Sequence, residues 1–167
     1  MMTAFPLSVV QDCRSVMERF HCALLSGLWG MDLGEGCRVS LKARLDKTNP
    51  RGVHIGKHVS VARDAAILAH DSVEVRHLDT FIGERCAIGA SAVIYPGVRI
   101  GDGCIIDAGA VVTRDIPPGS AVAGNPARIV EKNIRTGKFG VRLGGEKPVR
   151  PELPVAAAER SGEALQA

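Results

Sequence analysis

Residues 82–130 read IGERCAIGASAVIYPGVRIGDGCIIDAGAVVTRDIPPGSAVAGNPARIV, and this stretch decides the fold. An aliphatic residue recurs in it at every sixth position: Ile82, Ile88, Ile94, Ile100, Ile106 and Val112. Four positions after each of these stands a small or medium-sized residue: Cys86, Ala92, Val98, Cys104, Ala110 and Ile116. The same register continues upstream through Ile55, Val61 and Ile67.

A period of six fits neither a helix, which repeats every 3.6 residues, nor a plain strand, which repeats every two. Six residues can form one short strand and one corner, so that three units close a triangular coil of eighteen. Coils of this kind stack at about 4.8 Å, the spacing of paired strands. The pattern therefore predicts an all-β solenoid, a parallel β-helix filled by stacked aliphatic side chains. Cys86 and Cys104, eighteen residues apart, should stack as buried packing thiols.

The regions on either side of the repeat differ from it. Residues 8–28 carry apolar side chains at helical spacing and predict an amphipathic helix that covers the open end of the first coil. Residues 140–167 are rich in Gly and Pro and then in Ala and Glu, as in a poorly ordered tail. We expect a helical cap over 1–35, a β-helix over 36–130 and a partly disordered C-terminal extension over 131–167.

Charge and hydropathy exclude several classes of protein. Residues 1–127 carry 13 basic and 13 acidic side chains, so the net charge of +3 comes from the last quarter of the chain. This excess is too weak for a nucleic-acid-binding surface. There is no apolar run of membrane-spanning length and no secretory signal, so we expect a cytoplasmic protein without stable membrane insertion.

The five cysteines, Cys13, Cys22, Cys37, Cys86 and Cys104, form no C-x-x-C pair. We expect reduced thiols and no metal site.

The repeat slips once, between Ile67 and Ile82, where fifteen residues stand in place of the twelve of two hexads. The excess should leave the solenoid as a loop over roughly Asp71 to Thr80. His70 comes directly before it and should face outward near a corner. Loops on a rigid scaffold often carry function, and an imidazole titrates near neutral pH, so His70 is a candidate general base.

Residues 36–130 resemble the hexapeptide-repeat acyltransferases of the left-handed β-helix type. The 82–130 segment is similar to the maltose, galactoside and xenobiotic acetyltransferase branch. The segments LDKTNPRGVHIG and AHD resemble the sugar O-acetyltransferases of capsule and colanic-acid type. The left hand of the coil is implied by this resemblance alone. It also implies acetyl-CoA as co-substrate and transfer to a sugar hydroxyl of a cell-surface polysaccharide or its precursor, without an acyl-enzyme.

The resemblance assigns roles to individual residues. It implies that His70 is the catalytic base and that a backbone N–H near Ala90 stabilises the oxyanion. Some relatives have a serine at that position that also helps, whereas Ala90 has no hydroxyl and offers only its backbone. The resemblance implies that CoA is bound by Ala90, Ala108, Thr113, Arg114 and Arg128.

The acceptor and the assembly follow less directly. Asn49, Asp71 and Asp79 could hydrogen-bond sugar hydroxyls, although Asn49 before a proline also fits a simple turn. His77 could line the same pocket or be solvated. One prism cannot enclose both CoA and a sugar, and the family is typically trimeric, so we expect a homotrimer with a site at each interface.

Other functions remain open. N-acetylation of a nucleotide-linked amino sugar and a non-catalytic structural β-helix are the alternatives. A carbonic-anhydrase-like zinc enzyme needs three histidines, and residues 88–94, IGASAVI, contain none. Serine acetylation is disfavoured because that branch has a long helical N-terminal domain.

Overall fold

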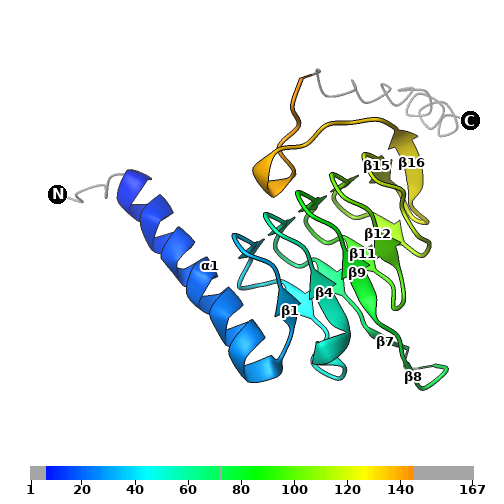
Figure 1. Cartoon of the computed structure of the whole chain (residues 1–167), viewed down its shortest axis with the longest axis horizontal. Helices are drawn as coiled ribbons and strands as arrows, with labels where there is room; N and C mark the ends of the chain where they lie inside the picture. The colour runs from blue at the N-terminus through cyan, green and yellow to red at the C-terminus, as the bar shows by residue number, and fades with distance from the viewer. Residues whose placement is uncertain (1–6, 72, 145–167) are drawn as a thin grey trace, which may run out of the picture.

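The computed structural model describes residues 7–71 and 73–144 of the chain. Helix α1, Leu7–Trp29, is followed by a three-sided prism of short parallel strands (Figure 1). The first face contains β1 (Asp32–Leu33), β4 (Val53–Ile55), β9 (Thr80–Ile82) and β12 (Arg99–Ile100). The third face contains β3 (Arg44–Leu45), β6 (Ala66–Ile67), β11 (Val93–Ile94) and β14 (Val111–Val112).

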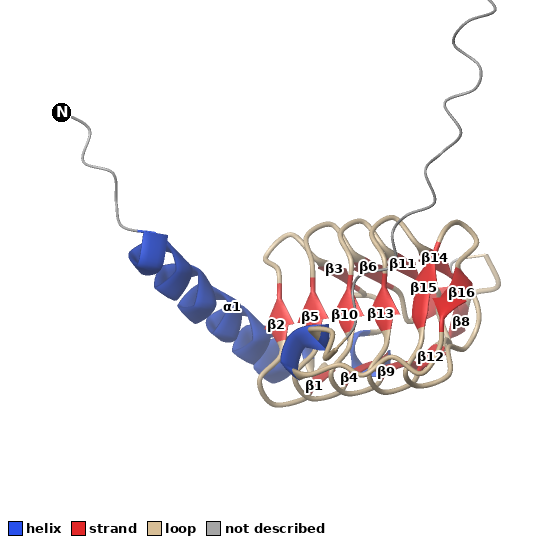
Figure 2. Cartoon of the chain, turned by 90° about the horizontal axis from the view of Figure 1, so that it is seen from above, coloured by secondary structure: helices blue, strands red, loops and turns tan. Residues whose placement is uncertain are grey.

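The second face is the widest, and Figure 2 looks onto its strands lying side by side. It contains β2 (Arg38–Val39), β5 (Ser60–Val61), β10 (Ala87–Ile88), β13 (Ile105–Ile106) and β15 (Ala121–Ala123), all parallel. The last strand, β16 (Arg128–Glu131), pairs antiparallel with β15 and ends the sheet. The predicted parallel β-helix is thus confirmed.

The core is the predicted stack of aliphatic side chains. The six aliphatic residues at the repeat position are all buried, and so are the six residues four positions later. Cys104 N–H lies 3.4 Å from Cys86 Sγ, and both side chains are fully buried, as eighteen-residue stacking requires. These thiols therefore serve packing.

The coils differ in length more than the hexads indicated. Val39, Val61, Ile88 and Ile106 are paired on successive coils, at spacings of 22, 27 and 18 residues. Ile67 and Ile82 lie on consecutive faces, the third and then the first. The expected spacing between them was therefore six, and nine extra residues leave the prism rather than three.

The nine-residue excess forms a hairpin. Strand β7 (His70–Asp71) pairs antiparallel with β8 (Arg76–His77). The chain rejoins the prism before Thr80, which is buried and donates its hydroxyl to Leu68 O at 2.6 Å. The loop predicted over Asp71 to Thr80 is therefore shorter at its C-terminal end.

Helix α1 matches the predicted range but covers the prism only in part. Leu25 of the helix and Met31, which comes shortly after it, are buried in the core, and the helix contacts β1 and β2. Among residues 16–29 of the helix, whose side chains the structure describes, five large apolar side chains stay exposed: Val16, Met17, Phe20, Leu24 and Leu28. The helix leans away from the prism (Figure 1), so its apolar spacing overstates how much of it is packed.

Residues 131–144 fold back along the prism, and we call this segment the strap. It contains the 3₁₀ helix η2, Lys138–Gly140, and runs along the turns between the first and second faces. Its hydrogen bonds reach successively earlier coils: Ile134 N–H to Gly119 O, the Thr136 hydroxyl to Arg85 O, and Phe139 N–H to His58 O. The rest of the predicted tail, 145–167, lies outside the described residues.

Candidate active site

His70 stands where the hairpin leaves the third face. Strand β6 ends at Ile67, Ala69 is still buried in the core, and His70 begins β7. Its side chain is 25% exposed, as the predicted outward position near a corner requires. Across the hairpin, His77 is its direct partner in the strand pairing, which places two imidazoles on neighbouring backbones.

Asp46 is the residue that holds His70. Leu45 is paired with Ile67, so Asp46, the next residue, reaches the turn that follows β6. Its Oδ2 accepts from Ala69 N–H at 2.7 Å and contacts His70 Nδ1. Its Oδ1 accepts from Thr48 N–H at 2.8 Å and from Asn49 N–H at 3.3 Å. The carboxylate is almost completely shielded, with 1% of its side chain exposed.

The charge state of Asp46 follows from these contacts. Burial by itself raises the pKa of a carboxyl group, but the hydrogen bonds from Ala69, His70, Thr48 and Asn49 outweigh burial and lower the pKa of Asp46. An ionised Asp46 can only accept a hydrogen bond, so the His70 Nδ1–H donates to it, and in the neutral ring Nε2 carries the lone pair. This is the arrangement of a histidine that acts as a base through Nε2.

Asn49 and Asp79 lie close to this pair. The Asn49 side chain donates to Ala69 O at 2.9 Å, on the residue directly before His70. Both Asn49 and Asp79 pack against Gly52, the last residue of the 3₁₀ helix η1, Pro50–Gly52. A Cβ at position 52 would overlap the Asn49 side-chain amide and lie 2.9 Å from Asp79 Oδ1, so a larger residue there would have to displace these side chains.

Asp71 shapes the hairpin. Its Oδ1 accepts from Val73 N–H at 2.8 Å and from Glu74 N–H at 3.1 Å. These bonds form a local turn of the kind that Asp side chains favour. The predicted contact of Asp71 with an acceptor hydroxyl stays a prediction.

The residues expected to bind CoA lie on two different edges of the prism. Thr113 and Arg114 follow β14, at the same corner as His70 and two coils further along, and both are exposed. Arg128 is exposed at the start of β16. These three residues therefore lie toward the C-terminal end of the prism.

Ala90 and Ala108 lie at the other edge of the third face, in the turns that lead into β11 and β14. Gly109 N–H bonds to Ala90 O at 2.9 Å, which stacks the two turns. Within the described ranges no acceptor bonds the Ala90 N–H. The third face separates this amide from His70, so a single chain does not bring the two together.

Asp46 is the functional candidate that the sequence reasoning missed. The hexads predicted from the sequence begin at Ile55, yet the buried Val39 and Leu45 and the partly buried Leu33 continue the core as a further coil. The ten residues from Leu45 to Ile55 interrupt the period, and Asp46 stands at that interruption. An acidic residue at the start of an insertion in the coil before His70 was the available signal.

Among the described residues, no three His, Cys, Asp or Glu side chains are grouped as a metal ion would need. No helix in that part of the chain is long and apolar enough to cross a membrane.

Comparison with known proteins adds to this geometry. A family model described as a hexapeptide repeat of succinyl-transferase matches residues 80–114. YvoF of Bacillus subtilis (strain 168), whose name assigns it provisionally to the acetyltransferases, is 36% identical over 102 residues. That alignment covers 60% of this chain and 59% of YvoF, so the chain spans less than two thirds of its relative.

Two solved structures share the fold. A maltose O-acetyltransferase from Clostridium difficile 630 is 26% identical with a TM-score of 0.50, covering 70% of this chain and 87% of that chain. A galactoside acetyltransferase solved in complex with coenzyme A is 24% identical with a TM-score of 0.55, covering 78% and 74%. With these likenesses, the repeat and the three parallel faces make the solenoid a left-handed parallel β-helix.

Proposed function

We propose that this chain, a member of the hexapeptide-repeat acetyltransferase family, transfers an acetyl group from acetyl-CoA to a hydroxyl group of a sugar. The observation that carries the proposal is the contact of His70 Nδ1 with the buried carboxylate of Asp46. The fold alone would serve a structural role equally well, whereas an imidazole oriented by a shielded anion is typical of acid–base chemistry.

His70 acts as the general base in this proposal. Its Nε2 removes the proton of the acceptor hydroxyl while the hydroxyl oxygen bonds to the acetyl carbonyl carbon. The carbon–sulfur bond breaks, and CoA leaves as the thiol after taking up the proton from His70. Asp46 holds the ring and stabilises its protonated form. No acyl-enzyme is needed, and the buried Cys86 and Cys104 are poorly placed to form one.

The donor is bound along the edges of the third face. The Ala90 N–H, which has no acceptor within the described residues, suits the charge that develops on the thioester oxygen. Ala108, in the stacked turn, offers backbone groups to the pantetheine arm. Thr113, Arg114 and Arg128 are exposed, and the two guanidinium groups suit the phosphates of CoA.

The complete site needs a neighbouring copy. His70 and Ala90 lie on opposite edges of the third face, so base and oxyanion donor come from two chains. A homotrimer with one site at each interface satisfies this requirement, as family membership suggests. We place the enzyme in the cytoplasm, where acetyl-CoA is available.

The acceptor is a sugar of a cell-surface polysaccharide or of its precursor. Asn49, which bonds to the residue before His70, Asp79, which packs with Asn49 against Gly52, and Asp71 in the hairpin supply the oxygen and amide groups that recognise hydroxyls. The likeness to a maltose O-acetyltransferase supports a sugar as the acceptor class.

An assay of CoA release with acetyl-CoA and a panel of sugars and nucleotide-linked amino sugars tests the proposal. His70→Ala should lower turnover by about 10²–10⁴-fold while CoA still raises the melting temperature. His21→Ala, on helix α1, is the matched control and should keep full activity. Activity on amino groups alone would mean that the chain is an N-acetyltransferase instead. An unchanged turnover of His70→Ala would contradict its role as the general base. A fully active monomer, measured by light scattering, would contradict a site shared between chains.

A further inference from the structure

A cavity lies at the corner between the first and second faces of the prism, and the hairpin leaves the prism at a different corner. It has a volume of about 620 Å³, within the usual range for small-molecule sites. Three parts of the chain line it: helix α1, the turns at the start of the prism and the strap. The lining includes Arg19 from the helix, Arg38 and Glu35 from the first coil, and Lys138 from the strap.

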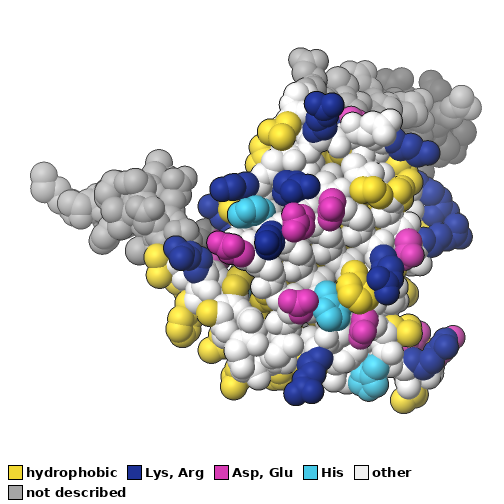
Figure 3. Space-filling model, in the orientation of Figure 1, with side chains coloured by type: hydrophobic (Ala, Val, Ile, Leu, Met, Phe, Trp, Pro, Cys, Tyr) yellow, Lys and Arg dark blue, Asp and Glu magenta, His cyan; other side chains and the backbone are white. Residues whose placement is uncertain are grey.

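The cavity carries an excess of positive charge. Arg19, Arg38 and Lys138 make no ion pair with any residue in the ranges 7–71 and 73–144, and neither does Glu35. Three cations and one anion leave a net charge of +2. In Figure 3, Lys and Arg side chains surround a histidine below the strap, at the upper end of the first coils, and acidic side chains lie next to them.

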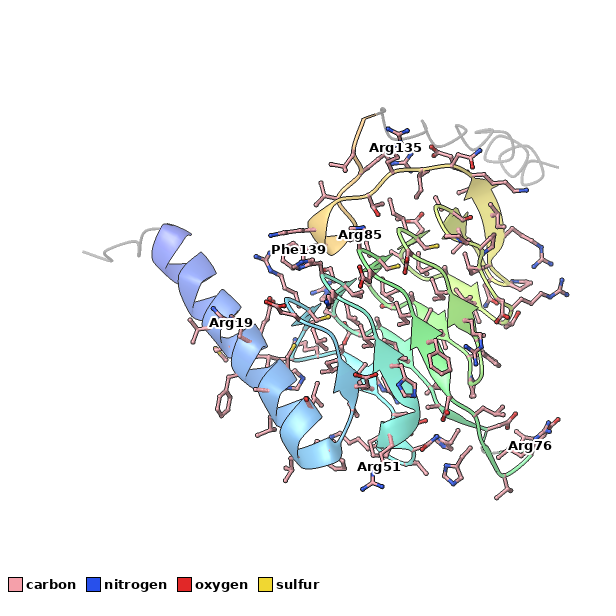
Figure 4. The ribbon with its side chains drawn as sticks, viewed as in Figure 1. Arg19, Arg51, Arg76, Arg85, Arg135 and Phe139 are labelled. Carbon is pink, nitrogen blue, oxygen red and sulfur yellow. The ribbon has the colours of Figure 1, made fainter. Side chains whose placement is uncertain are left out.

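Arg38 is held in place before any ligand arrives. Its guanidinium carbon lies 3.9 Å from the centre of the Phe139 ring. Phe139 is fixed in turn, because its N–H donates to His58 O at 2.8 Å and its ring meets the His58 ring edge-on. Figure 4 shows Phe139 at the turn of the strap and Arg19 on the helix. A cation that is already ordered loses less entropy when it binds an anion.

We propose that this cavity binds a phosphate monoester of a small polar molecule. A phosphate monoester carries a charge of about −1.5 to −2 at pH 7, which matches the excess in the cavity. Planar guanidinium groups bind phosphate oxygens in pairs, and the lysine adds a point charge. Glu35 and Ser26, which also line the cavity, supply hydrogen-bond partners for hydroxyl groups of the organic part.

The site is separate from that of the proposed acetyl transfer. The cavity opens on the turns between the first and second faces, whereas His70 lies where the third face leads into the next coil. None of the residues proposed for CoA or the acceptor lines it. The inference therefore does not rest on the proposed function.

Isothermal titration with glucose 6-phosphate, glucose and inorganic phosphate tests the inference on the full chain. Glucose 6-phosphate should bind more tightly than inorganic phosphate, and glucose should not bind. The double variant Arg38→Gln/Lys138→Gln should weaken binding by at least about tenfold, as expected for the loss of a charge-assisted hydrogen bond. The matched control Arg135→Gln/Lys132→Gln removes the same charges from the strap outside the cavity and should bind like the wild type.

A third variant separates this site from the CoA site. Arg114→Gln/Arg128→Gln should leave the binding of glucose 6-phosphate unchanged, and circular dichroism checks that every variant is folded. The inference is overturned if glucose 6-phosphate does not bind, if the control weakens binding as much as Arg38→Gln/Lys138→Gln, or if only Arg114→Gln/Arg128→Gln abolishes it. Equal affinity for inorganic phosphate would reduce the site to a simple anion site and also contradict the proposal.

Discussion

Asp46 and His70 are in contact although 24 residues separate them, because Leu45 and Ile67 are paired on adjacent coils. The pairing fixes the two backbones side by side, and three amide groups hold the carboxylate in one orientation. The pairing of two adjacent coils thus orients the imidazole of His70.

Replacing Asp46 by Asn tests this orientation. Asp46→Asn keeps the shape of the side chain but removes the charge and leaves one oxygen for three amide donors. We expect turnover to fall by about 10²-fold or more, and the free energy of unfolding to fall by about 1–3 kcal/mol. Because both residues act as one unit, Asp46→Asn in a His70→Ala background should cost little further activity. Additive losses in this cycle of variants would argue against a coupled pair.

The pH dependence of stability should carry the signature of Asp46. The pKa of Asp46 is lower in the folded chain than in the unfolded chain. Its contribution to the free energy of unfolding is therefore fully present above the ordinary carboxyl pKa, and it is lost as the pH falls through the pKa of the folded chain. In urea unfolding, the gap in stability between wild type and Asp46→Asn should therefore shrink below about pH 4. Asp64→Asn, at an exposed carboxylate, is the control and should show little gap at any pH. A gap for Asp46→Asn that widens in acid would contradict this assignment.

Gly52 tests the packing beside the site. A Cβ there would lie 2.9 Å from Asp79 Oδ1, so Gly52→Ala must displace Asp79 or Asn49. We expect a loss of about 1–3 kcal/mol in unfolding free energy together with reduced turnover. Gly27→Ala is the matched control, because nothing lies within 4 Å of its added Cβ, and a helical Ala should stabilise by roughly 0.5–1 kcal/mol. Similar results for the two variants would show that the contact with Asp79 is unimportant.

The aliphatic stack gives a stability prediction that is independent of function. Ile94 is fully buried, whereas Val73 in the hairpin is 91% exposed. Ile94→Ala should cost about 2–5 kcal/mol in chemical unfolding, and Val73→Ala should stay within about 0.5 kcal/mol. A small effect of Ile94→Ala would mean that the core can collapse around the lost methyl groups.

The sequence predicted the prism well because each aliphatic residue of the six-residue period corresponds to one inward-facing position of the core. Every aliphatic residue counted from Ile55 onward is buried, since an inward position at each strand tolerates little else. The period does not reveal the earlier coil, because the insertion after Leu45 interrupts it. Asp46 was missed for the same reason, since its partner is defined by coil register and not by distance along the chain.

Helix α1 and the strap show a different limit. Helical spacing correctly predicted α1 but not that Phe20 and Leu28 would be left exposed, because periodicity gives the apolar face and not what covers it. The strap has no period at all. Its position depends on single hydrogen bonds such as that from Phe139 to His58, which composition does not encode.

The strap also affects the order in which the coils of the prism should unfold. In a solenoid each coil normally contacts only its neighbours, so the terminal coils fray before the middle ones melt. Here one segment bonds to Gly119 near one end and to His58 near the other. Loss of these bonds should replace a single cooperative unfolding transition by stepwise unfolding that begins at the C-terminal coil.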